Sequence, residues 1–149
     1  MLKEILFLCT GNTCRSPMAE VIARDLFGET ARFTSRGASV FAPSRASADA
    51  EYTVELEFGL SLANHTAREL TEADIARADL ILTMTRAHKD FVLRAYPAYA
   101  DKCFTLCAYT TQLDQDIRDP YGMDIDAYRA CARELRACIE KLSFESNMN

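Results

Sequence analysis

The stretch EILFLCTGNTCRSPMAE, residues 4–20, places an apolar run, a polar loop and the start of a helix in direct succession. Residues 4–9 are short and apolar, which is typical of a strand buried on both faces. From Pro17 to Phe27 apolar residues recur at helical spacing, and proline favours the first turn of a helix. The stretch therefore predicts a buried strand, a loop and a helix at the start of the fold.

Apolar runs and helical periods alternate along the rest of the chain. Strands are expected over residues 4–9, 32–40, 78–84 and 102–106, and helices over 17–27, 47–60, 86–95 and 124–142. A further short helix is expected at Thr71, because Thr71 and Asp74 have capping-box spacing. Parallel neighbours need crossover connections, so this alternation indicates a parallel sheet with helices on both faces. We predict one α/β domain over residues 1–149, with a polar loop over 114–123 and a frayed tail over 143–149.

Composition and charge narrow the class of protein. The 149 residues are 49% hydrophobic and 26% charged, which is ordinary for one soluble globular domain. The formal net charge is −5 and the basic residues are scattered, which argues against a nucleic-acid partner, because binding the phosphate backbone needs a basic face. No segment has the pattern of a signal peptide or the length of an apolar membrane span. We therefore expect a cytoplasmic monomer without a membrane partner.

The six cysteines are expected to be free thiols, because a chain with this much apolar content does not need disulfides. No C-x-x-C motif occurs, and the two histidines, His65 and His88, are far apart in the sequence. This pattern disfavours a metal site.

The loop after the first strand, from Cys9 to Ser16, has the form C-x5-R-S. A loop that runs into a helix N-terminus directs several backbone N–H groups to one point, and the helix dipole adds positive charge, so phosphate is a suitable ligand. Gly11 lets the backbone approach closely, and Arg15 can bind two phosphoryl oxygens with its planar fork. The same field is expected to lower the pKa of Cys9 and make it a thiolate nucleophile. A buried free cysteine beside a surface arginine is the alternative, but the position after the first strand favours the phosphate loop.

The loop also differs from the nucleotide-binding motifs. The lysine of the G-x-x-x-x-G-K-[ST] motif is missing, and no G-x-G-x-x-G sequence follows a strand. Nucleotide binding is therefore disfavoured.

A candidate acid lies in the polar loop before the last helix, in the sequence DPYG of residues 119–122. Transfer of a phosphoryl group to sulfur needs a proton for the leaving group. Loops at the carboxyl ends of parallel strands converge on one crevice, so Asp119 can meet Cys9 despite the distance in sequence. Taken alone, the DPYG sequence is more typical of a simple turn than of a catalytic loop.

The segments CTGNTCRSPMAE (residues 9–20) and DPYG (residues 119–122) resemble the two signatures of the low-molecular-weight protein-tyrosine-phosphatase family. The resemblance implies a four-stranded parallel sheet flanked by helices and phosphorylated protein substrates. It also implies a cysteinyl-phosphate intermediate without a metal or organic cofactor. By this match Cys9 is the nucleophile, Arg15 the phosphate clamp and Asp119 the general acid and base.

The resemblance also assigns supporting residues. Asn12, Ser16, Ser35 and His65 match a hydrogen-bond network that holds the phosphate loop in shape, and Ser16 would also assist the thiolate as a leaving group. Arg36 departs from the family pattern, because the family usually has a small residue after the matched serine. The sequence therefore does not predict the local geometry at Arg36. The full set expected to contact phosphate or substrate is Thr10, Gly11, Asn12, Thr13, Cys14, Ser16, Phe41 and Tyr121.

Thr13 bears on the choice of substrate. Thr13 followed by Cys14 resembles the bacterial protein-arginine phosphatases, whereas tyrosine-directed members commonly carry a larger aliphatic residue at this position. A small wall with a hydroxyl beside phosphorus suits a guanidinium N–P bond. Aromatic walls at Phe41 and Tyr121 would stack a phenol or a guanidinium equally well. Phosphoarginine is therefore the favoured substrate, and phosphotyrosine is the alternative.

The sequence disfavours two other functions for this loop. A thioredoxin-coupled arsenate reductase needs extra cysteines that residues 82–90 lack. A noncatalytic phosphate-binding or redox-sensing module would not need Asp119. Cys14 is close enough in sequence to pair with Cys9 under peroxide and protect the nucleophile.

Overall fold

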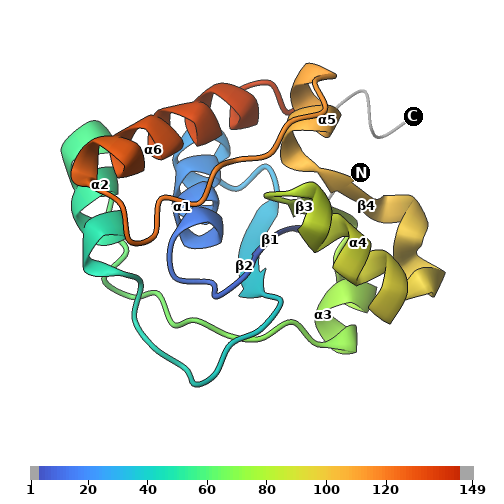
Figure 1. Cartoon of the computed structure of the whole chain (residues 1–149). Helices are drawn as coiled ribbons and strands as arrows, with labels where there is room; N and C mark the ends of the chain where they lie inside the picture. The colour runs from blue at the N-terminus through green and yellow to red at the C-terminus, as the bar shows by residue number, and fades with distance from the viewer. Residues whose placement is uncertain (1–3, 145–149) are drawn as a thin grey trace.

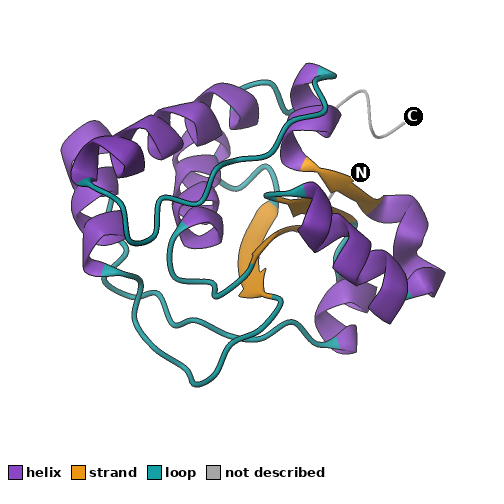
Figure 2. Ribbon diagram, viewed as in Figure 1, coloured by secondary structure: helices purple, strands orange, loops and turns teal. Residues whose placement is uncertain are grey.

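A four-stranded parallel sheet in the order β2–β1–β3–β4 forms the centre of the computed structural model, which describes residues 4–144 (Figures 1 and 2). The strands are β1 (Glu4–Cys9), β2 (Arg32–Gly37), β3 (Leu80–Thr83) and β4 (Cys103–Thr105). The helices are α1 (Arg15–Phe27), α2 (Ala48–Phe58), α3 (Glu72–Arg77), α4 (Arg86–Ala95), the 3-10 helix η1 (Pro97–Lys102), α5 (Leu106–Thr111) and α6 (Ile125–Ile139). The predicted α/β class and four-stranded parallel sheet are confirmed.

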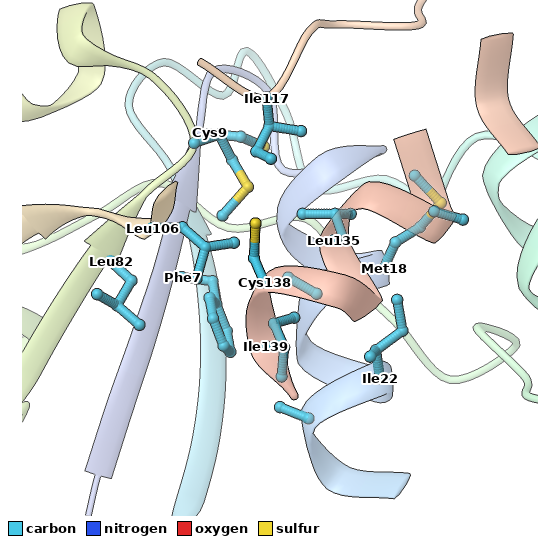
Figure 3. Close-up of a cluster of buried hydrophobic side chains, with 14 of the residues drawn as sticks. Phe7, Cys9, Met18, Ile22, Leu82, Leu106, Ile117, Leu135, Cys138 and Ile139 are labelled. Atoms are coloured by element: carbon cyan, nitrogen blue, oxygen red, sulfur yellow. The ribbon is translucent and has the colours of Figure 1, made fainter. Parts of the chain in front are cut away.

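Strand β1 is buried along its whole length because it has a hydrophobic layer on each face. Ile5 and Phe7 pack with residues of α1 and α6, and Leu6 and Leu8 pack with residues of α3 and α4. Figure 1 shows α1, α2 and α6 on one side of the sheet and α3 and α4 on the other. Figure 3 shows Phe7 and Cys9 facing side chains of α1 and α6. Burial of each such side chain contributes on the order of 1.5–3 kcal/mol, so the end of β1 is held firmly.

Most element boundaries lie near the expected residues, and the deviations have local causes. Helix α1 starts at Arg15, before Pro17, because proline can occupy the first turn. Ser47 and Asp124 have extended backbone and cap α2 and α6, so they lie outside these helices. Strand β2 ends at Gly37, earlier than expected, where the chain turns into the loop before α2.

The sequence predicted one short helix, α3, and did not predict two other helices. Thr71 and Asp74 form the predicted capping box, since the Thr71 hydroxyl accepts from the Asp74 amide and the Asp74 carboxylate accepts from the Thr71 amide. Helix α5 and the 3-10 helix η1 flank the very short strand β4. The hydroxyl of Thr105, the last residue of β4, accepts from the backbone of Ala108 and so starts α5 directly after the strand.

The prediction of a frayed tail over residues 143–149 is wrong for Phe144. Phe144 packs against Phe27 with ring centroids 4.9 Å apart and an interplanar angle of 74°. Residues 145–149 lie outside the described residues. Within the part of the chain that the structure describes, no helix is long and apolar enough to cross a membrane.

Candidate active site

The C-x5-R-S segment forms a loop between the central strand and the first helix. Cys9 is the last residue of β1, and Cys14 is the N-cap of α1. The N-cap residue Cys14 makes no side-chain capping hydrogen bond, so backbone N–H groups of the first turn of α1 are left for other acceptors. The loop borders a cavity of about 210 Å³, which is lined by Cys9, Thr10, Gly11, Thr13, Cys14, Arg15, Asp119 and Tyr121. The structure thus brings the expected nucleophile, clamp and acid to one cavity.

Asn12 organises the far side of the loop. It is fully buried and has a left-handed backbone with a φ of 58°, a conformation that asparagine tolerates better than most residues. Its Nδ2 donates to Ser16 Oγ at 2.8 Å and to Ser35 Oγ at 3.0 Å. Its carbonyl oxygen accepts from His65 Nε2 at 2.7 Å, and its Oδ1 accepts from the Arg68 amide at 3.0 Å. The expected network of Asn12, Ser16, Ser35 and His65 is present.

Glu20 extends this network, and sequence reasoning did not include it. The Ser35 hydroxyl donates to Glu20 Oε1 at 2.6 Å.

Arg36, the residue that departs from the family pattern, directs its side chain away from the phosphate loop. Its Nε donates to Asp74 Oδ2 at 3.1 Å and its Nη1 donates to the Ser35 carbonyl at 2.7 Å. The Arg36 side chain therefore does not bind the Ser35 hydroxyl, which accepts a hydrogen bond from Asn12.

Gly37 packs directly against the phosphate loop. A Cβ atom at this position would lie 2.7 Å from the Thr10 carbonyl oxygen and 3.1 Å from Asn12 Cβ. The first distance is shorter than any real Cβ contact, and the atom it meets belongs to the backbone. Only glycine allows β2 to support the loop so closely.

The pKa of Cys9 departs from the expectation drawn from the sequence. The thiol is almost completely buried, and this desolvation raises its pKa. The Ser16 hydroxyl, 2.8 Å from Cys9 Sγ, opposes the increase most strongly, followed by the Ser16 amide, Arg15 and the Asn12 amide. The prediction of a lowered pKa is therefore wrong for this state of the site, because burial outweighs the nearby donors and the positive charge.

Arg15 and Asp119 contact each other across the cavity. The Arg15 side chain is buried, and its Nη1 donates to the Ile117 carbonyl at 2.9 Å. Its Nη2 lies 3.5 Å from Asp119 Oδ2. Asp119 is half exposed, and its Oδ1 accepts from the Tyr121 amide at 3.0 Å. The DPYG segment is thus both a turn and the carrier of a carboxylate that faces the phosphate loop.

The two expected aromatic walls differ in position. Tyr121 lines the cavity and is 71% exposed. Phe41 is fully exposed and does not line the cavity. The prediction that Phe41 forms the second wall is wrong for this structure, because the loop after β2 carries it into solvent.

Cys14 contacts the N-cap residue of α2 and a residue of α6. Its sulfur lies 3.4 Å from Ser47 Oγ and 3.4 Å from the Tyr128 hydroxyl. Cys9 and Cys14 are both free thiols that line the same cavity. Their pairing under oxidation remains a prediction.

His88, in the first turn of α4, is a site residue that sequence reasoning missed. Its Nε2 lies 2.8 Å from Thr10 Oγ1, and its Nδ1 lies 3.0 Å from Thr85 Oγ1. Burial, helped by the charge of Arg15, lowers the pKa of His88 from 6.5 to about 4. The imidazole is therefore neutral at physiological pH. No spacing motif links His88 to Thr10, so only the fold reveals the contact.

The lowered pKa of His88 makes stability depend on pH. Between its unfolded pKa of 6.5 and its folded pKa of about 4, the unfolded chain binds more protons, so acidification destabilises the fold. This group should account for about 2 kcal/mol of the loss between pH 7 and pH 5. His88→Gln should remove that share, as measured by denaturant unfolding at both pH values. An unchanged pH dependence in the variant would show that His88 does not titrate in this way.

A buried cysteine, a buried arginine and an aspartate border one small cavity at the end of a parallel strand, an arrangement that suits the chemistry of a cysteine-dependent phosphatase. Residues 4–148 match the family model described as low molecular weight phosphotyrosine protein phosphatase. The chain belongs to this family and is a cysteine-dependent protein phosphatase.

Relatives with different substrates in their names are equally similar to the chain. A protein-arginine-phosphatase of Bacillus subtilis is 39% identical over 142 residues, covering 94% of each chain. The low molecular weight protein-tyrosine-phosphatase PtpB of Staphylococcus aureus is 39% identical over 140 residues, covering 93% of this chain and 96% of PtpB. Among solved structures, the YwlE arginine phosphatase of Geobacillus stearothermophilus superposes with a TM-score of 0.91 at 36% identity, covering 98% of this chain and 94% of that one. Identity alone does not choose the substrate.

Proposed function

We propose that this phosphatase hydrolyses phosphoarginine in proteins through a cysteinyl-phosphate at Cys9. The phosphoryl group would occupy the cavity beside Cys9, where the loop amides and Arg15 can bind its oxygens. Cys9 attacks phosphorus as its thiolate, so that an S–P bond forms and the N–P bond of the substrate breaks. Asp119 gives its proton to the leaving guanidine nitrogen.

The second step reverses these roles. The Asp119 carboxylate takes a proton from water, and the water oxygen attacks phosphorus. The S–P bond breaks and the electron pair returns to Cys9 as a thiolate. Ser16 Oγ, 2.8 Å away, can donate its hydroxyl to that thiolate, while its own oxygen accepts from Asn12. This donor matters because burial raises the pKa of Cys9 and so disfavours the thiolate.

The observation that carries the substrate choice is the Thr13 side chain on the cavity wall. Thr13 lines the cavity beside Cys9, and its carbonyl accepts from the Ser47 amide at 2.9 Å, which holds the residue in place. The nitrogen that links phosphorus to arginine belongs to a group rich in N–H donors, whereas the ester oxygen of phosphotyrosine has no hydrogen. A threonine hydroxyl can accept from such a donor, and an aliphatic side chain cannot.

A direct comparison of substrates tests this proposal. We expect a higher kcat/KM for phosphoarginine peptides than for phosphotyrosine peptides of matched sequence. Thr13→Ile adds bulk and removes the hydroxyl without touching Cys9, Arg15 or Asp119. The ratio of the two kcat/KM values should shift by about tenfold or more toward phosphotyrosine, since a lost hydrogen bond and one extra methylene each change discrimination.

Thr13→Val is the matched control, because valine keeps the size of threonine and lacks only its hydroxyl. If the hydroxyl matters, Thr13→Val should reproduce most of the shift. The phosphoarginine proposal fails if the unmodified protein prefers phosphotyrosine by kcat/KM, and phosphotyrosine is then the substrate class.

A further inference from the structure

Two side-chain hydrogen bonds of the buried His88 ring connect the phosphate loop to helix α4. His88 is 7% exposed and links two threonine hydroxyls, with Nε2 toward Thr10 and Nδ1 toward Thr85. Thr85 is the N-cap of α4, and its Oγ1 also accepts from the backbone amide of His88 at 3.1 Å. Thr10 lines the catalytic cavity. The His88 ring therefore joins a helix cap to the first residue after Cys9.

Counting hydrogens leaves two arrangements for these bonds, and each has one hydroxyl hydrogen without an acceptor among the hydrogen bonds of the described residues. The Thr85 oxygen already accepts from an amide, and its single hydroxyl hydrogen can be donated to Nδ1 of His88. Nε2 then carries the ring hydrogen and donates it to Thr10 Oγ1. In the opposite arrangement Nδ1 would donate to Thr85 and Thr10 would donate to Nε2, so the spare hydrogen would lie on Thr85, which does not line the cavity. The first arrangement leaves the Thr10 hydrogen free.

The rest of Thr10 is fixed independently of His88. Its carbonyl oxygen accepts from the Ser39 amide at 3.0 Å, and Gly37 packs against the same oxygen. What His88 determines is the orientation of the hydroxyl. With one lone pair occupied by Nε2–H, the Thr10 hydrogen can point into the cavity toward an anion.

We infer that His88 is a positioning residue that turns the Thr10 hydroxyl into a hydrogen-bond donor for the bound phosphoryl group. This inference deepens the proposed function, but it concerns the phosphoryl group and not the group attached to it. The lowered pKa of His88 supports it, because a neutral ring has one donor and one acceptor and so keeps the chain polarised. A hydrogen bond to a charged group is among the stronger kind, so its loss should weaken phosphate binding about tenfold.

The test uses inorganic phosphate as the probe and its dissociation constant as the readout. Thr10→Val and His88→Leu should each raise that constant about tenfold. The double variant should be no weaker than either single variant, because His88 acts only through Thr10. His88→Gln should restore most of the affinity, since the glutamine amide can donate to Thr10 from the place of Nε2. Additive losses, unchanged binding in Thr10→Val or no rescue by glutamine would overturn the inference.

A measurement on the unmodified protein covers the case in which a variant fails to fold. Two-bond ¹H–¹⁵N correlations of the His88 ring distinguish the two neutral tautomers. We expect the hydrogen on Nε2, and a hydrogen on Nδ1 would overturn the inference. Neither readout depends on turnover or on the choice between phosphoarginine and phosphotyrosine. The inference and the proposed substrate can therefore fail separately.

Discussion

Replacing Cys9 with serine is expected to abolish turnover, lowering kcat by at least about 10⁴-fold on every phosphorylated substrate. A serine hydroxyl ionises far less readily than a thiol, and in this buried position nothing replaces the lost nucleophile. Phosphate should still bind, because the loop amides and Arg15 are unchanged. Steady-state kinetics and a phosphate titration of the same preparation measure the two effects.

Cys103→Ala is the matched control for the loss of a thiol. Cys103 is buried in β4 and does not line the catalytic cavity. Activity should therefore persist in this variant. Substantial phosphatase activity in Cys9→Ser would exclude Cys9 as the nucleophile.

Asp119→Asn is expected to lower kcat by about 10²–10⁴-fold on phosphoarginine peptides. Asparagine keeps the size of the side chain and can still accept from the Tyr121 amide, but it cannot deliver a proton. The leaving guanidine is a strong base and needs that proton. The kcat of the variant on a phosphate ester whose leaving group departs as a stable anion should fall much less.

Asp114→Asn is the control within the same loop. Asp114 pairs with Arg86 at the surface at 3.3 Å and does not line the cavity. The kcat values of the Asp114→Asn variant on both substrates should be nearly unchanged. An equal loss on both kinds of leaving group in Asp119→Asn would indicate that Asp119 supports the loop and is not the acid.

The features that the sequence predicted well depend on short segments. Strand β1, the loop and helix α1 follow from residues 4–20, where apolar runs, Gly11 and Pro17 act locally. The capping box of Thr71 and Asp74 is another local pattern. The approach of Asp119 to Arg15 could be predicted because parallel strands send their following loops to the same edge of the sheet.

The features that were missed depend on tertiary contacts. Burial decides the direction of the Cys9 pKa, and no motif reports how deeply a loop cysteine lies. The contact between His88 and Thr10 joins α4 to the phosphate loop and has no sequence spacing of its own. Phe41 was predicted to form the second aromatic wall beside Tyr121, whereas the path of the loop after β2 leaves it in solvent.

The contact between Arg15 and Asp119 means that the acid has an internal counter-ion before any substrate arrives. An incoming phosphoryl dianion competes for the same guanidinium and takes the place of the carboxylate. Under the proposed mechanism, substrate entry is thus an anion exchange that releases Asp119, which takes up a proton before it serves the leaving group, while the bond from Arg15 to the Ile117 carbonyl keeps the loop attached. After phosphate departs and Asp119 releases the proton that it took from water, its carboxylate can pair with Arg15 again.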